Sequence, residues 1–246
     1  MRLPVKIHQP FGPYILETTC PKELIDALNK KIEDVCSDPE EMEKYCSSKK
    51  NVPNLLLRDI EVIYFAENFL KEIGFADFVE TLGDYYIENA DNTDHYGHSS
   101  VKLSIIPTDS SFHSMFKLCG DIRYADAWVN RYYSGDFTPL HDHGSDLAGI
   151  VILKVPEDLH EANIKNRDSE DDSTEERMGG NVQFINGPSR AFSPGEYMPD
   201  QEVGKVLLFP SWVPHLTYPL PVNSERRTLS FNLGSEHEYR NRFTAN

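Results

Sequence analysis

Apolar positions in the first part of the chain recur every three or four residues, which is typical of helices that bury one face. Residues 21–47 show this pattern most clearly, and Pro21 stands near the expected helix start. Residues 59–90 predict one or two further helices with a break near Gly74. We therefore expect residues 1–98 to form an N-terminal helical part. The residues on the apolar face of the first helix are Leu24, Ile25, Leu28 and Ile32.

From about residue 100 the pattern changes to short runs rich in β-branched and aromatic residues. Gly, Pro, Asn and Asp separate these runs, as in a β-sandwich or jelly roll. The fold class is therefore mainly β with flanking helices, with a jelly-roll core over residues 99–236 that the N-terminal part braces. The strands are expected within 100–107, 124–133, 147–155, 181–185, 204–210 and 226–233.

Two polar segments stand outside this core. One is an insertion near residues 160–178, whose part from 167 to 177 is mostly acidic and too polar to bury much surface. We expect it to be mobile, or to act as a lid that substrate orders. The other is a short C-terminal tail, residues 237–246.

Composition narrows the possible partners and location. The formal net charge is −16, from 24 Lys and Arg against 40 Asp and Glu, which argues against nucleic-acid and anionic-lipid partners. No apolar run reaches the ~18 residues of a membrane span, and the N-terminus lacks the pattern of a signal peptide. The 4 cysteines form no CxxC pair, so reduced thiols are expected. These features favour a cytoplasmic protein.

Two histidines mark a candidate metal site. His141 and His143 are two residues apart on an extended segment, so their side chains can point into one cavity. His215 follows a buried strand and is well placed as a third ligand. Asp142 or Asp146 could supply an oxygen ligand in place of His143 if the loop bends. Because imidazole must be neutral to bind a metal, affinity is expected to fall as pH drops through about 6.5.

An arginine pair opens the last predicted strand. Neighbouring residues on a strand face opposite sides, and one face here is polar while the other is apolar. The polar face suits a ligand pocket, so Arg226 is expected to point inward with Ser230 as a second hydrogen-bond donor. Arg227 is expected near a sheet edge with solvent access. The polar face continues with Thr228, Ser230 and Asn232, and the apolar face with Leu229, Phe231 and Leu233.

Two segments, "WVNRYYSGDFTPLHDHGSDLAGIVIL" and "GKVLLFPSWVPHLTYPLPVNSERRTLSFN", resemble the 2-oxoglutarate- and Fe(II)-dependent oxygenases. The resemblance is closest to the prolyl-hydroxylase-like branch found in bacteria and bacteriophages. It implies a double-stranded β-helix, the cofactors Fe(II), 2-oxoglutarate and O2, and a 2-oxoglutarate carboxylate on Arg226. It implies the iron ligands His141, His143 and His215.

The chain departs from that family's usual pattern at two places. Most members have a carboxylate where His143 stands. The strand "AGIVILK" also lacks the tyrosine that often contacts 2-oxoglutarate. Tyr132, Asn130 or Tyr218 could replace that contact.

The favoured function is a dioxygenase that hydroxylates a C–H bond of a peptide, a protein or a small molecule, with succinate and CO2 as co-products. One alternative is a cupin-type metal enzyme that does not use 2-oxoglutarate. Leu147 and Ala148 stand where a cupin would place its glutamate, which counts against it. The other alternative is a non-catalytic β-sandwich module.

Overall fold

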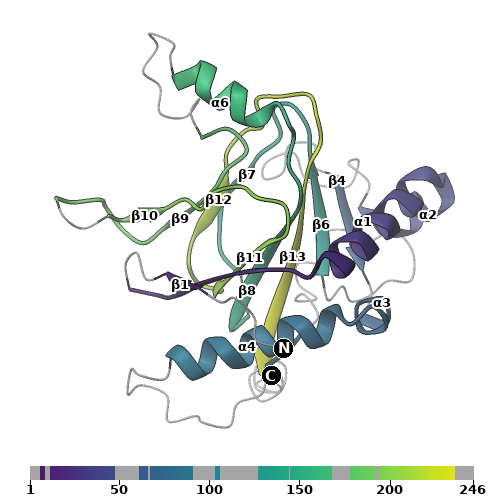
Figure 1. The fold of residues 1–246 in the computed structure, drawn as a ribbon, viewed down its shortest axis with the longest axis horizontal. Helices are drawn as coiled ribbons and strands as arrows, with labels where there is room; N and C mark the ends of the chain where they lie inside the picture. The colour runs from purple at the N-terminus through teal and green to yellow at the C-terminus, as the bar shows by residue number, and fades with distance from the viewer. Residues whose placement is uncertain are drawn as a thin grey trace, which may run out of the picture.

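The computed structural model describes residues 6–8, 12–47, 61–65, 67–90, 103–105, 127–143, 145–167, 178–191 and 194–235. Their strands form a nine-stranded and a four-stranded sheet, drawn in Figure 1. The large sheet has the order β1 (Lys6–His8), β2 (Ile15–Thr19), β11 (Lys205–Pro210), β8 (Leu147–Lys154), β13 (Arg226–Ser235), β6 (Ala127–Tyr132), β4 (Glu61–Phe65) and β3 (Cys46–Ser47), with β5 (Leu103–Ile105) paired to β13. The small sheet has the order β10 (Glu196–Tyr197), β9 (Val182–Ile185), β12 (His215–Thr217) and β7 (Thr138–His141).

The two sheets pack through an apolar layer, which gives the predicted mainly β jelly roll. The layer includes Ala148 and Phe209 of the large sheet and Phe184 of the small one, all buried. On the strands of the large sheet, alternate residues point into this layer and the rest point toward the helices. The functional side chains described below come from the inward set.

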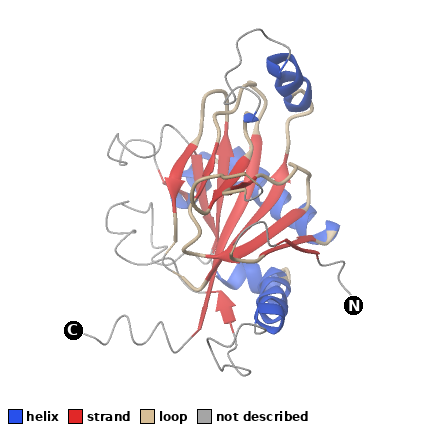
Figure 2. Cartoon of the chain, turned by 90° about the vertical axis from the view of Figure 1, so that its left-hand side faces the viewer, coloured by secondary structure: helices blue, strands red, loops and turns tan. Residues whose placement is uncertain are grey.

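Helices cover the outer face of the large sheet, as Figure 2 shows. One continuous core joins α1 and α4 to that face, with Leu28 and Val79 among its fully buried members. α1 forms because its apolar residues recur on one side, and Gly74, with a φ of 80°, separates α3 from α4. The helices are α1 (Lys22–Ser37), α2 (Pro39–Tyr45), α3 (Glu67–Glu72), α4 (Phe75–Ala90) and α6 (Leu159–Arg167).

Three sequence expectations need correction or fall outside the described residues. Residues 61–65, expected to be helical, form β4, because this β-branched and aromatic run pairs with β6. The N-terminal part also supplies β1, β2 and β3, so it extends the large sheet as well as bracing it. The predicted insertion near 160–178 opens with the helix α6, whereas residues 168–177 and the tail 237–246 lie outside the described residues.

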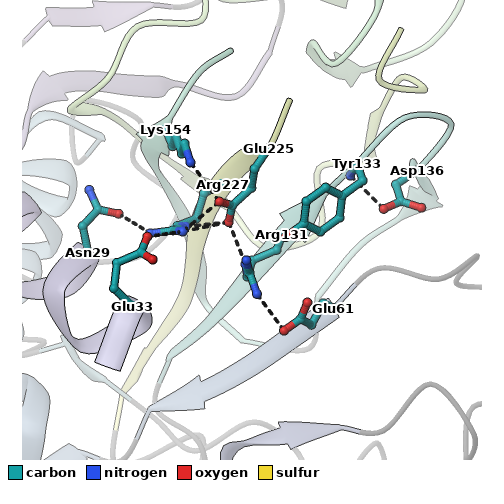
Figure 3. Close-up of polar contacts among 9 residues, drawn as sticks. All are labelled: Asn29, Glu33, Glu61, Arg131, Tyr133, Asp136, Lys154, Glu225 and Arg227. Carbon is teal, nitrogen blue, oxygen red and sulfur yellow. Dashed lines mark hydrogen bonds and ion pairs between the residues drawn. The ribbon is translucent and has the colours of Figure 1, made fainter. Parts of the chain in front are cut away.

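Arg227 is not near a sheet edge. β13 lies between β8 and β6 in the middle of the large sheet, and α1 covers the face that Arg227 points to. The side chain is 1% exposed and pairs with Glu225 at 2.8 Å and with Glu33 at 2.7 Å. Figure 3 shows the surrounding network of polar contacts. Its members around Arg227 are Asn29, Glu33, Glu61, Arg131, Lys154 and Glu225.

Gly149 allows a close approach between β8 and β13. It stands directly opposite Phe231 in the register, and a Cβ atom at Gly149 would lie 2.0 Å from the Phe231 ring. The ring therefore occupies the space that a side chain at position 149 would need. It also packs edge-on against Phe75 of α4, with the ring centroids 5.8 Å apart.

In the part of the chain that the structure describes, no helix is both long and apolar enough to cross a membrane.

Replacing Arg227 should destabilise the fold. Arg227→Met removes the donor to the Asn29 amide oxygen and one of the three cations that contact the buried Glu225 carboxylate, so we expect a loss of about 3 kcal/mol in the free energy of unfolding. Lys154→Met is the control, because this lysine contacts the same Glu225 but is 48% exposed, and we expect a loss under about 1 kcal/mol. Urea denaturation measures both variants, and equal small losses would show that Arg227 does not stabilise the helix-covered face.

Candidate functional site

Three histidines converge at one end of the jelly roll. His141 ends β7, His215 begins β12, and the two residues are register partners. His143 follows in the loop after β7, where its backbone N–H donates to the Ser211 carbonyl at 2.9 Å. One ring nitrogen from each histidine lies within 4.8 Å of the others. Neither Asp142 nor Asp146 belongs to this group, although both were considered as ligands from the sequence.

Backbone carbonyls fix the tautomers of two of these rings. His141 Nδ1 lies 2.8 Å from the Pro139 carbonyl and His215 Nδ1 lies 3.1 Å from the Val213 carbonyl. A carbonyl only accepts, so each Nδ1 carries its proton and each Nε2 keeps a lone pair. Such a second hydrogen bond is the usual way a protein orients a metal-binding histidine.

The spacing of the nitrogens fits a divalent metal. His143 Nε2 and His215 Nε2 are 3.3 Å apart. Two nitrogens at right angles around a metal, each about 2.1 Å from it, would be about 3.0 Å apart. His143 and His215 therefore fit adjacent positions around a six-coordinate ion such as Fe(II), and a ring nitrogen of His141 lies within 4.8 Å of both.

The surroundings keep the three imidazoles neutral. Burial and, to a smaller extent, the nearby His141 lower the pKa of His143 to about 3. Burial also lowers the pKa of His141 and, together with the other two rings, that of His215. The sequence alone suggested that protons compete with metal near pH 6.5. With these lowered pKa values the competition begins at a lower pH.

Aromatic side chains wall this cluster. The Trp128 ring lies 5.8 Å from the His143 ring, and the Phe209 ring lies 4.9 Å from the His215 ring. Phe184 contacts His215 from the small sheet, with the centroids 5.7 Å apart. These rings limit water at the nitrogens, which strengthens electrostatic interactions there.

Arg226 points into the jelly roll, as the alternation along the last strand predicts. It is fully buried, and its Nε and Nη2 donate to Gln201 Oε1 at 3.2 and 2.7 Å. Nη1 is buried and has no hydrogen-bond partner. Burial lowers the pKa of Arg226, although the guanidinium stays protonated in proteins. Among the residues that the structure describes, no carboxylate pairs with it, in contrast to Arg227.

The remaining predicted residues lie around Arg226. The guanidinium sits over the Tyr132 ring, 5.1 Å from its centroid, and the Tyr132 hydroxyl is 2.7 Å from Thr138 Oγ1 on β7. Tyr132 therefore contacts both Arg226 and β7, the strand that carries His141. Asn130 Nδ2 donates to Ser230 Oγ at 3.3 Å on the same inward face.

Tyr218 does not join this group. Its hydroxyl donates to Gln183 Oε1 at 2.7 Å. Along β12, His215 and Thr217 point inward, so alternation turns Tyr218 outward. This leaves Tyr132 and Asn130 as the polar residues beside the arginine that the sequence had suggested.

Gln201 and Thr138 were missed from the sequence. Gln201 lies in an irregular segment before β11, where no periodic pattern shows which way a side chain points. Thr138 opens β7, and its partnership with Tyr132 depends on the contact between the two sheets. Alternation gave no signal for Thr138, because a residue three positions before His141 on a regular strand would point to the opposite face.

The comparisons with known proteins agree with this geometry. Residues 126–232 match the model of a family described as "Putative 2OG-Fe(II) oxygenase". This match indicates an oxygenase that uses Fe(II), 2-oxoglutarate and O2. No curated protein matches the chain.

Solved structures share the fold. A Pseudomonas putida prolyl-4-hydroxylase matches with a TM-score of 0.53 at 11% identity, over 90% of this chain and 92% of its own. A prolyl hydroxylase from Trichoplax adhaerens, in complex with a peptide fragment, matches with a TM-score of 0.52 at 12% identity, over 91% of this chain and 84% of its own. The oxygenase thus has the double-stranded β-helix of the prolyl hydroxylases.

The lowered pKa of His143 predicts how the metal-free oxygenase responds to acid. In the unfolded chain its imidazole takes a proton near pH 6.5, whereas in the fold it resists protonation until about pH 3. Its contribution to stability is therefore complete above pH 6.5 and is lost as pH falls toward 3, at up to about 1.4 kcal/mol per pH unit.

His143→Gln removes that titration, so wild type should lose stability faster than the variant between about pH 6.5 and 4. Urea unfolding in the presence of a chelator measures this difference. Parallel pH profiles would contradict the lowered pKa.

Proposed function

We propose that His141, His143 and His215 bind Fe(II) and that Arg226 binds the distal carboxylate of 2-oxoglutarate. The observation that carries this proposal is the fully buried Arg226, whose Nη1 has no partner. An unpaired buried cation is expensive, and a carboxylate from a ligand removes that penalty. When bound, the iron with 2-oxoglutarate and O2 supplies the oxidising chemistry.

The residues of the chain have separate tasks in this proposal. Gln201 holds one edge of the guanidinium, formed by Nε and Nη2. The edge that includes Nη1 is left for a carboxylate, which arginine binds with two parallel hydrogen bonds. Tyr132 stacks on the guanidinium and fixes its plane. Ser230 and Asn130 offer further polar contacts along the same face.

We further propose that the oxygenase hydroxylates a C–H bond of a peptide or protein and releases succinate and CO2. Trp212 is 56% exposed in the turn that leads into His215. An exposed tryptophan beside a metal cluster is a suitable contact for a substrate chain. The peptide held by the Trichoplax adhaerens prolyl hydroxylase supports the same class of substrate. Small-molecule substrates and a cytoplasmic location stay predictions.

One experiment separates this function from a metal enzyme that does not use 2-oxoglutarate. Anaerobically purified protein is loaded with Fe(II), given 2-oxoglutarate and air, and assayed for succinate with and without candidate peptides. Succinate that depends on both Fe(II) and 2-oxoglutarate supports the proposal. Metal binding without any succinate would contradict it.

Loss of one histidine should abolish tight metal binding. We expect His215→Ala to reduce Fe(II) affinity by more than about 100-fold, since even loss of a partner outside the ligand set costs 10–100-fold. Anaerobic titration measures this, with His160→Ala as the control, because His160 lies on α6 away from the cluster. Undiminished binding in His215→Ala would remove this residue from the site.

Changing Gln201 to a carboxylate should stabilise the fold and weaken the binding of 2-oxoglutarate. Gln201→Glu places an anion on the free arginine, so the free energy of unfolding should rise, while 2-oxoglutarate binding should weaken by about tenfold or more. Calorimetric titration on Mn(II)-loaded protein measures the affinity, and Glu196→Gln is a control on the exposed β10 strand. Unchanged affinity in Gln201→Glu would show that the carboxylate binds elsewhere.

A further inference from the structure

A second buried polar atom on the inward face of β13 has no partner. Asn232 is 5% exposed, and its Oδ1 makes no hydrogen bond. It stands six residues after Arg226 on the same face of the strand. At about 3.3 Å per residue the two Cα atoms are about 20 Å apart, so Asn232 serves a different end of the site.

The register of the large sheet places Asn232 beneath the histidine cluster. Asn232 is opposite Ala148 on β8, and Ala148 is opposite Phe209 on β11. The His215 ring lies against Phe209. One row of inward residues therefore runs from the wall of His215 to Asn232.

On the other side of the cluster, the register leads to Ser230, the neighbouring inward position on β13. Ser230 is opposite Trp128 on β6, and the His143 ring lies against Trp128. In the large sheet, β8 and β13 lie between β11 and β6. The His143 and His215 rings are 5.1 Å apart, so the cluster that they form lies over these two central strands. Ala148 on β8 is too small to fill that space. Asn232 on β13 is the polar side chain of its row.

A buried amide that lacks a partner destabilises the fold by roughly 1–3 kcal/mol, so it is retained where a ligand satisfies it. The oxygen and nitrogen of the amide exchange places by rotation without a change of shape. Asn232 can therefore present an N–H to an anion. Among the residues that the structure describes, no carboxylate belongs to the histidine cluster, so we take the anion to come from the ligand.

We propose that the Asn232 amide donates a hydrogen bond to the metal-chelating end of the 2-oxo acid, its carboxylate and keto oxygens. This inference rests on the proposed function, in which Arg226 holds the other end. Asn232 is then a binding residue at the metal end. A hydrogen bond to an ionised carboxylate is about twice as strong as a neutral one, which favours this partner over water.

The test compares two ligands on Mn(II)-loaded protein by calorimetric titration. 2-Oxoglutarate chelates the metal through its keto oxygen and the adjacent carboxylate, whereas pentanoate keeps one carboxylate for Arg226 and lacks both of those groups. We expect Asn232→Leu to weaken 2-oxoglutarate binding about tenfold and pentanoate binding less than about twofold. Asn163→Leu is the matched control, since Asn163 Oδ1 is also buried without a partner but lies on α6, and it should change neither affinity.

Asn232→Asp guards against a folding defect, because it keeps the shape of the side chain. Its negative charge beside the chelate should weaken 2-oxoglutarate binding more than pentanoate binding. Unchanged 2-oxoglutarate affinity in both variants, or equal losses for both ligands, would overturn the assignment of Asn232. If wild type binds 2-oxoglutarate no better with Mn(II) than without it, the proposed function fails, and the assignment of Asn232 fails with it.

Discussion

The alternation of side chains along β13 organises this molecule. A central strand presents successive residues to opposite faces, so Arg226 and Arg227 enter environments that share no atoms. On one face Arg227 pairs with an amide and a carboxylate of α1 and with Glu225, the residue just before β13. On the other face Arg226 has a neutral amide and a tyrosine ring, and its Nη1 has no partner. In the proposed function, two identical side chains thus have different roles: Arg227 stabilises the fold and Arg226 binds the ligand.

The proposed metal site includes no carboxylate, and none pairs with Arg226, among the residues that the structure describes. Three neutral imidazoles leave both charges of a divalent metal uncompensated by the cluster. Arg226 adds a further cation at the other end of the cavity-facing strand. A doubly charged 2-oxo acid balances part of this charge, so ligand binding and charge compensation are one event. This coupling favours a dianion over a monoanion of similar shape.

The sequence predicted much of the site because its signals are local. Two histidines two residues apart, a third beside a buried strand and a polar face on the last strand all report side-chain direction. The burial of Arg227 was not predictable in this way, since alternation shows which face a residue points to and not what covers that face. Residues 61–65 were mistaken for helix because their pairing partner, β6, is far along the chain. Gln201 was missed because an irregular segment has no period.

Gly149 affects the position of the inward residues of β13, although it lies on the helix-covered face of the large sheet. The Phe231 ring lies where a side chain at position 149 would be, and Phe231 is one residue from both Ser230 and Asn232. A larger residue at 149 would push β13 away from β8 and turn the inward residues with it. Related sequences should therefore vary at these two positions together, with a bulkier residue at 149 accompanied by a smaller one at 231. Changes at these two positions, which lie on the helix-covered face, would then indicate changes in the position of the inward residues on the opposite face.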